Sequence, residues 1–236
     1  MGERKERPIL FSAPMVRAIL NEEKTVTRRI VDERRLFAKV GDFLPLFVVN
    51  YGINREQATR LAGLQGWTHA GPYGRPGDRL WVKEGFAFGH VHDAAPPSDV
   101  PPTYPSTIEF MRGAQTDTSV WYRCDVEADP ARHESWILRG RWRSPLHMPR
   151  WASRLALAIE SVRVERLHDI TEDDARAEGV ERVNGHPVRG AVFGCGPSYR
   201  EGFAQIWIDL NGADSWRANP WVWRVGFRRE GASRAP

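Results

Sequence analysis

One short stretch near the start of the chain combines residue types that can do nucleophilic and acid–base chemistry. Residues 22–29 read EEKTVTRR, so the amine of Lys24, the hydroxyls of Thr25 and Thr27 and two guanidiniums lie close together in the sequence. A lysine with a lowered pKa can accept a hydroxyl proton, and the hydroxyl then becomes a nucleophile. The alternative interpretation of the same residues is a basic edge strand without catalytic chemistry.

The elements expected around this stretch place it between a helix and a strand. Residues 9–11 predict a short strand, and Ser12 can cap a following helix that ends near Glu23. Residues 24–31, KTVTRRIV, alternate polar and β-branched types, which is typical of a partly exposed strand. The candidate residues therefore lie where the chain changes from helix to strand.

Side chains that alternate along a strand share one face. Thr25, Thr27 and Arg29 are spaced in this way. Lys24 lies at the bend before them and can lean toward the same face. We therefore expect an amine, two hydroxyls and a guanidinium to meet there.

The rest of the chain predicts short strands separated by turns. Strands are expected at residues 79–84, after a turn at residues 75–78, and at residues 120–126, 154–167 and 221–227. Between them, the Pro-rich residues 90–106 cannot form a central strand or a helix interior. We expect that segment to be an exposed loop.

Two further helices are predicted in the second half of the chain. Thr171 can cap the first, Glu178 closes it, and Gly179 is its expected stop. The second has four apolar residues with the spacing of one buried face: Phe203, Ile206, Trp207 and Leu210. Trp207, Trp221 and Trp223 are expected in the core.

Many short strands with a few short helices indicate an α+β fold, built as a small β-barrel with peripheral short helices and long loop insertions. The length of 236 residues fits one domain, residues 1–236. Its insertions are expected near residues 43–74, 87–118 and 180–198, and residues 229–236 should be a frayed tail.

A basic and aromatic segment suggests a second kind of function. Residues 139–154, RGRWRSPLHMPRWASR, contain no acidic residue. Aromatic and imidazole rings lie among the guanidiniums, which is typical of a surface that binds nucleic acid. The candidate contacts in this segment are Trp142, Arg143, His147, Arg150 and Trp151. The alternative is a solvated loop with structural arginines.

The composition excludes several classes of protein. Hydrophobic residues make up 41% and charged residues 27% of the chain, as in an ordinary globular protein, and the net charge is only +4. The two cysteines, Cys124 and Cys195, lie far apart without metal-ligand spacing, so we expect neither disulfides nor a zinc knuckle. No apolar stretch approaches the ~18 residues of a membrane span. We expect a cytoplasmic protein that does not bind membranes.

Other candidate groups are weaker. Trp81 and Glu84, on the strand expected at residues 79–84, could contact a base or a polar group of a substrate, although Glu84 could equally pair with a surface arginine. His90 and His92 precede Asp93, but a Pro-rich loop is a poor scaffold for metal ligands. We therefore predict no metal and no cofactor.

Two stretches of the chain resemble a known family. ILNEEKTVTRR is similar to the GxKxxxxR signature of ASCH domains, which belong to the PUA-like superfamily, and LHDITEDDARAEGV resembles the capped helix that follows their barrel strands. Lys24 takes the lysine position and Arg29 the arginine position. Glu22 stands where the family usually has glycine, so the tight turn before Lys24 is expected to differ.

This resemblance implies a PUA-like β-barrel and, with the segment WRSPLHMPRWASR, a longer bacterial and phage subgroup. Compact bacterial members of the family hydrolyse N(4)-acetylcytidine with a lysine, a threonine three residues later and a glutamate on the helix after the barrel. Carried over, these roles fall on Lys24, Thr27 and Glu178. The substrate would then be a modified nucleoside.

Two alternatives to this amidohydrolase remain open. The chain could be a non-catalytic module that binds RNA in the same cleft and along residues 139–154, or it could be a ribonuclease. In each case the expected partner is a modified nucleoside or RNA. The sequence does not predict an oligomeric state.

Overall fold

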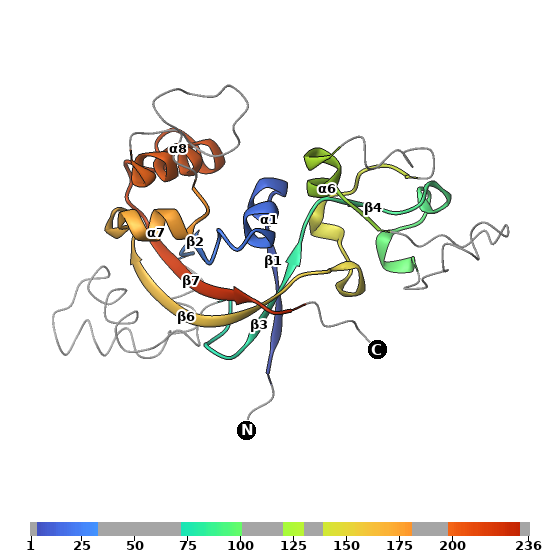
Figure 1. The fold of residues 1–236 in the computed structure, drawn as a ribbon, viewed down its shortest axis with the longest axis horizontal. Coiled ribbons are helices and arrows are strands. Elements are labelled where there is room, and N and C mark those ends of the chain that lie inside the picture. Colours follow the sequence, from blue (N-terminus) through green and yellow to red (C-terminus); the bar gives the residue numbers. More distant parts are fainter. Residues whose placement is uncertain (1–3, 33–71, 101–119, 130–138, 181–197, 232–236) are drawn as a thin grey trace. The chain divides into compact units, whose positions relative to one another are not determined.

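The central element is a five-stranded mixed sheet with the strand order β1-β3-β6-β7-β2 (Figure 1). The computed structural model describes residues 4–32, 72–100, 120–129, 139–180 and 198–231. The strands, in chain order, are β1 (Glu6–Leu10), β2 (Val26–Ile30), β3 (Arg79–Lys83), β6 (Ala156–Arg166) and β7 (Trp221–Arg229). Four of these segments were expected from the sequence within a few residues, and β1 begins earlier than predicted.

Backbone hydrogen bonds give the direction of each strand pair. Arg79 N donates to Lys5 O and Phe11 N to Lys83 O, so β1 and β3 are parallel. Strands β6 and β7 are antiparallel, as are β7 and β2. In the described part of the chain β1 and β2 are the two end strands and the sheet is not closed. The predicted α+β class is confirmed at this level.

The chain divides into two compact units, each with its own apolar cluster. The first unit comprises residues 1–7, 18–80 and 157–229, and the second comprises residues 8–17, 81–156 and 230–236. A cluster of the first unit contains Leu167, Ile170, Ala175, Val180, Phe203, Trp207 and Val222. A cluster of the second contains Phe86, Phe88, Val100, Met148 and Ala152.

Helix α1 (Ala13–Leu20) begins where the sequence predicts it. Val16 N donates to Ser12 O, and Val16 and Ile19 are buried. The helix ends three residues earlier than expected, because a turn at residues 21–22 follows Leu20. This turn leads directly into the stretch that contains Lys24.

Helices α7 (Glu172–Ala177) and α8 (Tyr199–Asn211) pack against each other in the first unit. Thr171 caps α7 by accepting a hydrogen bond from Asp174 N, as predicted, and Gly179 ends the segment with a φ of 81°. On α8, Phe203 and Trp207 are buried as predicted, but Leu210 is 59% exposed. That prediction was wrong because the apolar cluster beneath α8 does not extend to its last turn.

In the second unit, the predicted strand at residues 120–126 is mostly a helix. Only β5 (Trp121–Tyr122) is extended, and α6 (Arg123–Ala128) follows it directly. The partner strand β4 (Phe86–Ala87) is two residues long, so it offers ladder partners to Trp121 and Tyr122 alone. An ion pair between Arg123 and Glu127, one helical turn apart, further favours the helix.

Short 3-10 helices complete the described structure. They are η2 (His90–His92), η3 (Pro97–Asp99), η6 (Pro145–His147), η7 (Arg150–Ala152) and η8 (Leu167–Asp169). The expected exposed loop at residues 90–106 therefore contains two such turns, and Val100 at its described end is buried. Most of the predicted insertions near 43–74, 87–118 and 180–198, and residues 232–236 of the predicted frayed tail, lie outside the described residues. Within the described part of the chain, no helix is long and apolar enough to cross a membrane.

Candidate functional site

The site lies in the first unit, where the start of β2 meets the end of α7. Lys24 and Glu178 form an isolated antiparallel bridge, and Lys24 Nζ donates to Glu178 Oε2 at 2.6 Å and to Glu178 O at 2.9 Å. The two side chains are only 1% and 5% exposed. Two of the three predicted catalytic residues, which are far apart in the sequence, are therefore in direct contact.

Backbone geometry on both sides explains this close approach. Thr25 N donates to Ala177 O at 2.8 Å, which fixes the strand to the helix end. A Cβ atom on Gly179 would lie 2.9 Å from Ala18 Cβ and 3.1 Å from Lys24 Cβ, so a side chain at this position would push the two segments apart. On the other side, Glu22 makes the preceding turn with a φ of 64°.

Burial changes the proton affinities of these groups. It lowers the pKa of Lys24 below its ordinary value; Glu178 raises that pKa, and Arg29 and Arg28 lower it further. Burial likewise lowers the pKa of Arg29, against the opposing effects of Tyr73 and Glu178. At 2.6 Å, the Lys24–Glu178 contact is short enough for direct proton transfer between the two groups.

Thr27 is fully buried on β2, opposite Val225 of β7. Its Oγ1 atom has no hydrogen-bond partner, and Lys24 and Glu178 therefore do not accept from it. A buried hydroxyl without a partner costs free energy, of the order of 1–3 kcal/mol. Such an atom in a native structure calls for an explanation, of which a role in catalysis is one.

Three arginines form a row across neighbouring strands next to this pair. Arg28 of β2 lies opposite Arg224 of β7, and Arg224 lies opposite Arg163 of β6. We call these three residues the arginine row. Like charges in directly opposed positions repel each other, so the row needs carboxylates to compensate it.

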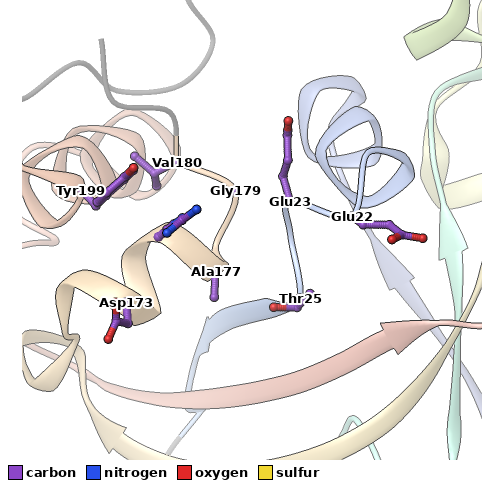
Figure 2. Close-up of a pocket in the computed structure, with 9 residues that line it drawn as sticks. Glu22, Glu23, Thr25, Asp173, Ala177, Gly179, Val180 and Tyr199 are labelled. Carbon is purple, nitrogen blue, oxygen red and sulfur yellow. The ribbon is translucent and has the colours of Figure 1, made fainter. Parts of the chain in front are cut away.

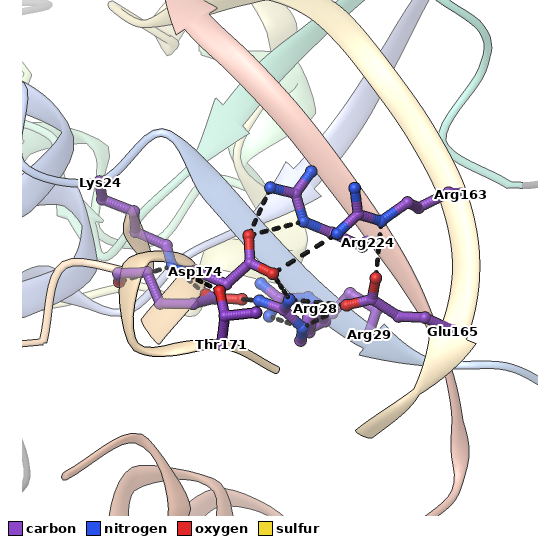
Figure 3. Close-up of polar contacts among 9 residues, drawn as sticks. Lys24, Arg28, Arg29, Arg163, Glu165, Thr171, Asp174 and Arg224 are labelled. Carbon is purple, nitrogen blue, oxygen red and sulfur yellow. Dashed lines mark hydrogen bonds and ion pairs between the residues drawn. The ribbon is translucent and has the colours of Figure 1, made fainter. Parts of the chain in front are cut away.

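Carboxylates from α7 and β6 compensate the arginine row (Figure 3). Asp174 accepts hydrogen bonds from all three arginines, at 2.9 Å from Arg28 and 2.6 Å from Arg224. Glu165 accepts from Arg28 at 2.6 Å and from Arg163 at 2.6 Å. Burial by itself raises the pKa of Asp174, but the arginines outweigh it and lower that pKa below the usual range.

Arg28 connects this network to the Lys24–Glu178 pair. Its Nη1 atom donates to Glu178 Oε1 at 3.2 Å. Arg28 was not among the predicted site residues, and Lys24 was expected to lean toward Thr25, Thr27 and Arg29. Lys24 instead shares the partner Glu178 with Arg28, which has the same strand parity. Arg29 Nη1 instead donates to Arg28 O at 3.2 Å, and Arg29 interacts with Tyr73.

A surface pocket of about 730 Å³ lies beside the site (Figure 2). Its lining includes the neighbours of Lys24, namely Glu23 and Thr25, and the neighbours of Glu178, namely Ala177 and Gly179. The other lining residues are Glu22, Asp173, Arg176, Val180 and Tyr199. Lys24 and Glu178 do not line the pocket, so the candidate residue that reaches it is Thr25.

In the second unit, Glu84 is engaged inside the protein. Arg154 donates to its two carboxylate oxygens at 3.0 Å and 3.2 Å and also binds Asp125. These contacts favour the alternative in which Glu84 pairs with an arginine rather than with a substrate. Burial raises the pKa of the adjacent Cys124 thiol, and Glu84 raises it further, so this cysteine is not a reactive thiolate.

The basic segment divides into buried and accessible side chains. Arg143 is buried and donates to the carbonyl oxygens of Ala95 and His92, and Trp151 stacks on Phe88 with ring centroids 5.3 Å apart. These contacts favour the alternative of a structural arginine at position 143. His147 and Arg150 are exposed.

Two half-buried tryptophans in the second unit each have two cations over their rings. Lys83 and Arg150 lie 5.1 Å and 5.8 Å from the ring centroid of Trp81. Arg139 and Arg123 lie 4.5 Å and 5.5 Å from that of Trp142. We call these two sets the cation–tryptophan clusters.

In the described part of the chain, no group of three or more His, Cys, Asp and Glu side chains is arranged to hold a metal ion. His92 Nε2 is buried without a hydrogen-bond partner, and it lies in η2 rather than in a ligand cluster.

Comparison with known proteins provides no relative from which a role could be transferred. No family model, no curated protein and no solved structure matches the chain. The roles proposed below therefore rest on the residues and contacts described above.

Proposed function

We propose that this chain is an ASCH-type protein with a PUA-like fold that hydrolyses an N(4)-acylated cytidine or a similar modified nucleoside through Lys24, Thr27 and Glu178. One observation carries the proposal: the buried Lys24 amine and Glu178 carboxylate lie 2.6 Å apart, and Thr27 on the following strand has a buried hydroxyl without a partner. Those are the parts of a nucleophile with an acid–base pair.

The backbone at Glu22 supports the resemblance on which this proposal draws. Glu22 stands where ASCH domains usually have glycine, and its φ of 64° is in the left-handed region that glycine favours. The turn thus has the conformation that a glycine would permit, although the side chain differs. Directly after it, Lys24 is held by the glutamate of the capped helix, in agreement with the proposed roles.

In the proposed reaction, the neutral amine of Lys24 accepts the Thr27 proton while Thr27 Oγ1 attacks the acyl carbon. The amide C–N bond then breaks, and the protonated carboxyl of Glu178 donates its proton to the leaving amine. Water hydrolyses the resulting ester of Thr27, which releases the carboxylic acid and restores the threonine hydroxyl. Burial favours the first step, because it lowers the pKa of Lys24.

This reaction places one requirement on the structure. Thr27 is fully buried and its hydroxyl is not bonded to Lys24 or Glu178. The substrate must therefore reach Thr27, and the hydroxyl must come within hydrogen-bonding distance of the pair, before proton transfer. A crystal structure with an N(4)-acetylcytidine analogue would test this requirement directly.

Acetate release from N(4)-acetylcytidine tests the proposed function. We expect Thr27→Ala to lower kcat by about 1,000-fold or more, since the nucleophile is lost. Ser161→Ala is the matched control, because it removes a half-buried hydroxyl from strand β6 of the same sheet outside the proposed site, and it should retain kcat within about threefold. If wild-type protein releases no acetate, or if Thr27→Ala retains full activity, the proposed reaction is wrong.

RNA binding is a second candidate, and the cation–tryptophan clusters favour it. Cations beside tryptophan rings can neutralise phosphates while the rings stack on unpaired bases. In this candidate function, RNA would contact Trp81, Trp142 and Arg150 rather than the buried Arg143. Ribonuclease activity would be a variant of this candidate and would produce shortened strands in the same assay.

Single-stranded RNA binding at several salt concentrations tests this candidate. The logarithm of the association constant should fall linearly with the logarithm of the salt concentration, and Arg150→Ala should reduce the slope by about 0.7. Arg217→Ala, at an exposed position of the first unit, is the control and should leave the slope unchanged. The candidate fails if wild-type protein does not bind RNA even at low salt.

A further inference from the structure

Arg28 occupies the centre of the buried charge network. Its side chain is fully buried and it contacts carboxylates from three places in the sequence: Glu165 on β6, Asp174 on α7 and Glu178 at the end of α7. The distances are 2.6 Å, 2.9 Å and 3.2 Å. Glu165 and Asp174 in turn bind Arg163 of the arginine row.

Both oxygens of the Glu178 carboxylate are bound by residues of one short segment, 24–28. Lys24 donates to Oε2 and Arg28 donates to Oε1. With both oxygens engaged, the plane of the carboxylate is fixed with respect to Lys24. Without Arg28, the Oε1 atom would lose this partner and the carboxylate could rotate about its last side-chain bond.

We propose that Arg28 is a positioning residue, which holds the Glu178 carboxylate in the orientation that exchanges a proton with Lys24. This inference rests on the proposed function of Lys24, Thr27 and Glu178. Glu165 and Asp174 hold the guanidinium of Arg28 and thereby act on Glu178 through it. Arg28 itself does not touch the substrate in this role.

The chemistry of arginine suits this role and that of lysine does not. A guanidinium is planar and presents its donors in a fixed fork, so one Arg28 side chain can bind three carboxylates in different directions. A lysine ammonium is a compact charge at the end of a flexible chain. Arg28→Lys therefore keeps the charge of the network while it loses the fixed orientation of Glu178.

Arg224 provides a matched control for a purely structural role. It lies opposite Arg28 in the sheet, and its Nε and Nη2 atoms bind Asp174 Oδ1 at 3.1 Å and 2.6 Å. None of its hydrogen bonds reaches Glu178 in the described structure. Arg224→Lys thus disturbs the same network without a direct effect on the proposed proton exchange.

The first measurement compares kcat and KM of the two variants on N(4)-acetylcytidine. Arg28→Lys should lower kcat by about 30-fold with KM changed by less than about threefold, whereas Arg224→Lys should change neither by more than about threefold. Thermal stability is measured in parallel for both. Equal losses of kcat in the two variants, or an unchanged kcat in Arg28→Lys, would overturn the inference.

A second variant covers the case in which Arg28→Lys does not fold. Glu165→Gln removes one holder of Arg28 and leaves Lys24 and Glu178 unchanged. It should lower kcat by about threefold to tenfold with little change in KM. A Glu165→Gln enzyme with wild-type kcat would also count against the inference.

A third measurement does not depend on catalysis. NMR of the Lys24 side-chain nitrogen, labelled with ¹⁵N, reports how fast its protons exchange with water, and the bond to Glu178 slows that exchange. Exchange should become about tenfold faster in Arg28→Lys and stay unchanged in Arg224→Lys. If this difference is found but wild-type protein releases no acetate, the proposed function fails and the positioning by Arg28 stands. If acetate is released and both variants exchange alike, the positioning fails and the function stands.

Discussion

At the scale of single residues, two left-handed backbone positions bring Lys24 to Glu178. Glu22 has a φ of 64° in the turn before Lys24, and Gly179 has a φ of 81° directly after Glu178. Left-handed geometry costs a residue with a side chain about 1–2 kcal/mol, while glycine adopts it without that cost. The two positions therefore differ in what substitution should do.

Replacement of Glu22 by glycine should stabilise the protein. Glycine relieves the strained backbone at this position. Two smaller effects oppose this gain, namely the greater conformational freedom of the unfolded chain and the loss of an exposed ion pair with Arg229. We therefore expect the free energy of unfolding to increase by about 0.5 kcal/mol. Urea denaturation measures it. Glu23→Gly, at the next residue and without a positive φ, should instead destabilise by a similar amount. If both substitutions change the free energy of unfolding in the same direction, the turn at Glu22 is not strained.

At Gly179 the opposite outcome is expected. A methyl group there would collide with Ala18 and Lys24 as well as adopt an unfavourable φ, so Gly179→Ala should destabilise the protein by about 2–3 kcal/mol. Gly77→Ala also has a positive φ, of 93°, but no atom lies within 4 Å of the added group, and it should cost only about 1 kcal/mol. Thermal unfolding of the two variants gives the comparison. Equal costs would mean that helix and turn are not in close contact at Gly179.

At the scale of elements, α7 is fixed to the sheet by charge as well as by apolar contact, since Ala175 belongs to the apolar cluster of the first unit. Asp174 of its first turn accepts from Arg28, Arg163 and Arg224, and Thr171 caps the same turn. The helix has only six residues, so it would not be stable by itself. The arginine row therefore helps to hold α7, and with it Glu178, against the sheet.

Loss of the Asp174 charge should therefore destabilise the protein in a pH-dependent manner. The folded-state pKa of Asp174 is lowered, so its contribution is present above the unfolded value, about 3.9, and is lost as the pH falls through the folded value. Asp174→Asn should cost about 3 kcal/mol at pH 7, and the difference from wild type should shrink below about pH 4. Asp173→Asn, at an exposed position, is the control and should change stability by less than about 0.5 kcal/mol. A pH-independent loss in Asp174→Asn would show that its charge is not what matters.

At the scale of the whole molecule, the two candidate functions lie in different units. Lys24, Thr27 and Glu178 belong to the first unit and the cation–tryptophan clusters to the second. Because the two sets share no residue, a substitution in one set is expected to remove one candidate function and to spare the other.

Crossed measurements on two variants test this separation. Trp81→Ala should weaken single-stranded RNA binding by about tenfold, because it removes one stacking ring, and should leave acetate release from N(4)-acetylcytidine within about threefold of wild type. Thr27→Ala should give the reverse pattern. If Trp81→Ala lowers both activities by the same factor without a loss of stability, the two functions share one site.

The sequence alone determined most of the local structure. The cap at Thr171, the stop at Gly179 and the strands β2, β3, β6 and β7 follow from short-range propensity and from side-chain alternation. The error at residues 120–126 has a tertiary cause, because the partner strand β4 ends after two residues. Alternation by itself does not reveal how long a partner strand will be.

The candidate site was predictable only in part. The resemblance to ASCH domains led to Lys24 and Glu178, which do form a contact, whereas Thr27 is bonded to neither of them. Arg28 has the same strand parity as Lys24, but nothing in the sequence shows that Glu165 and Asp174 lie within its reach. That depends on the registers of β2, β6 and β7, which bring residues more than one hundred positions apart to one face of a sheet. Local sequence sets which side chains share a face, and only the tertiary structure decides which charges meet across it, because strand pairing is a long-range interaction.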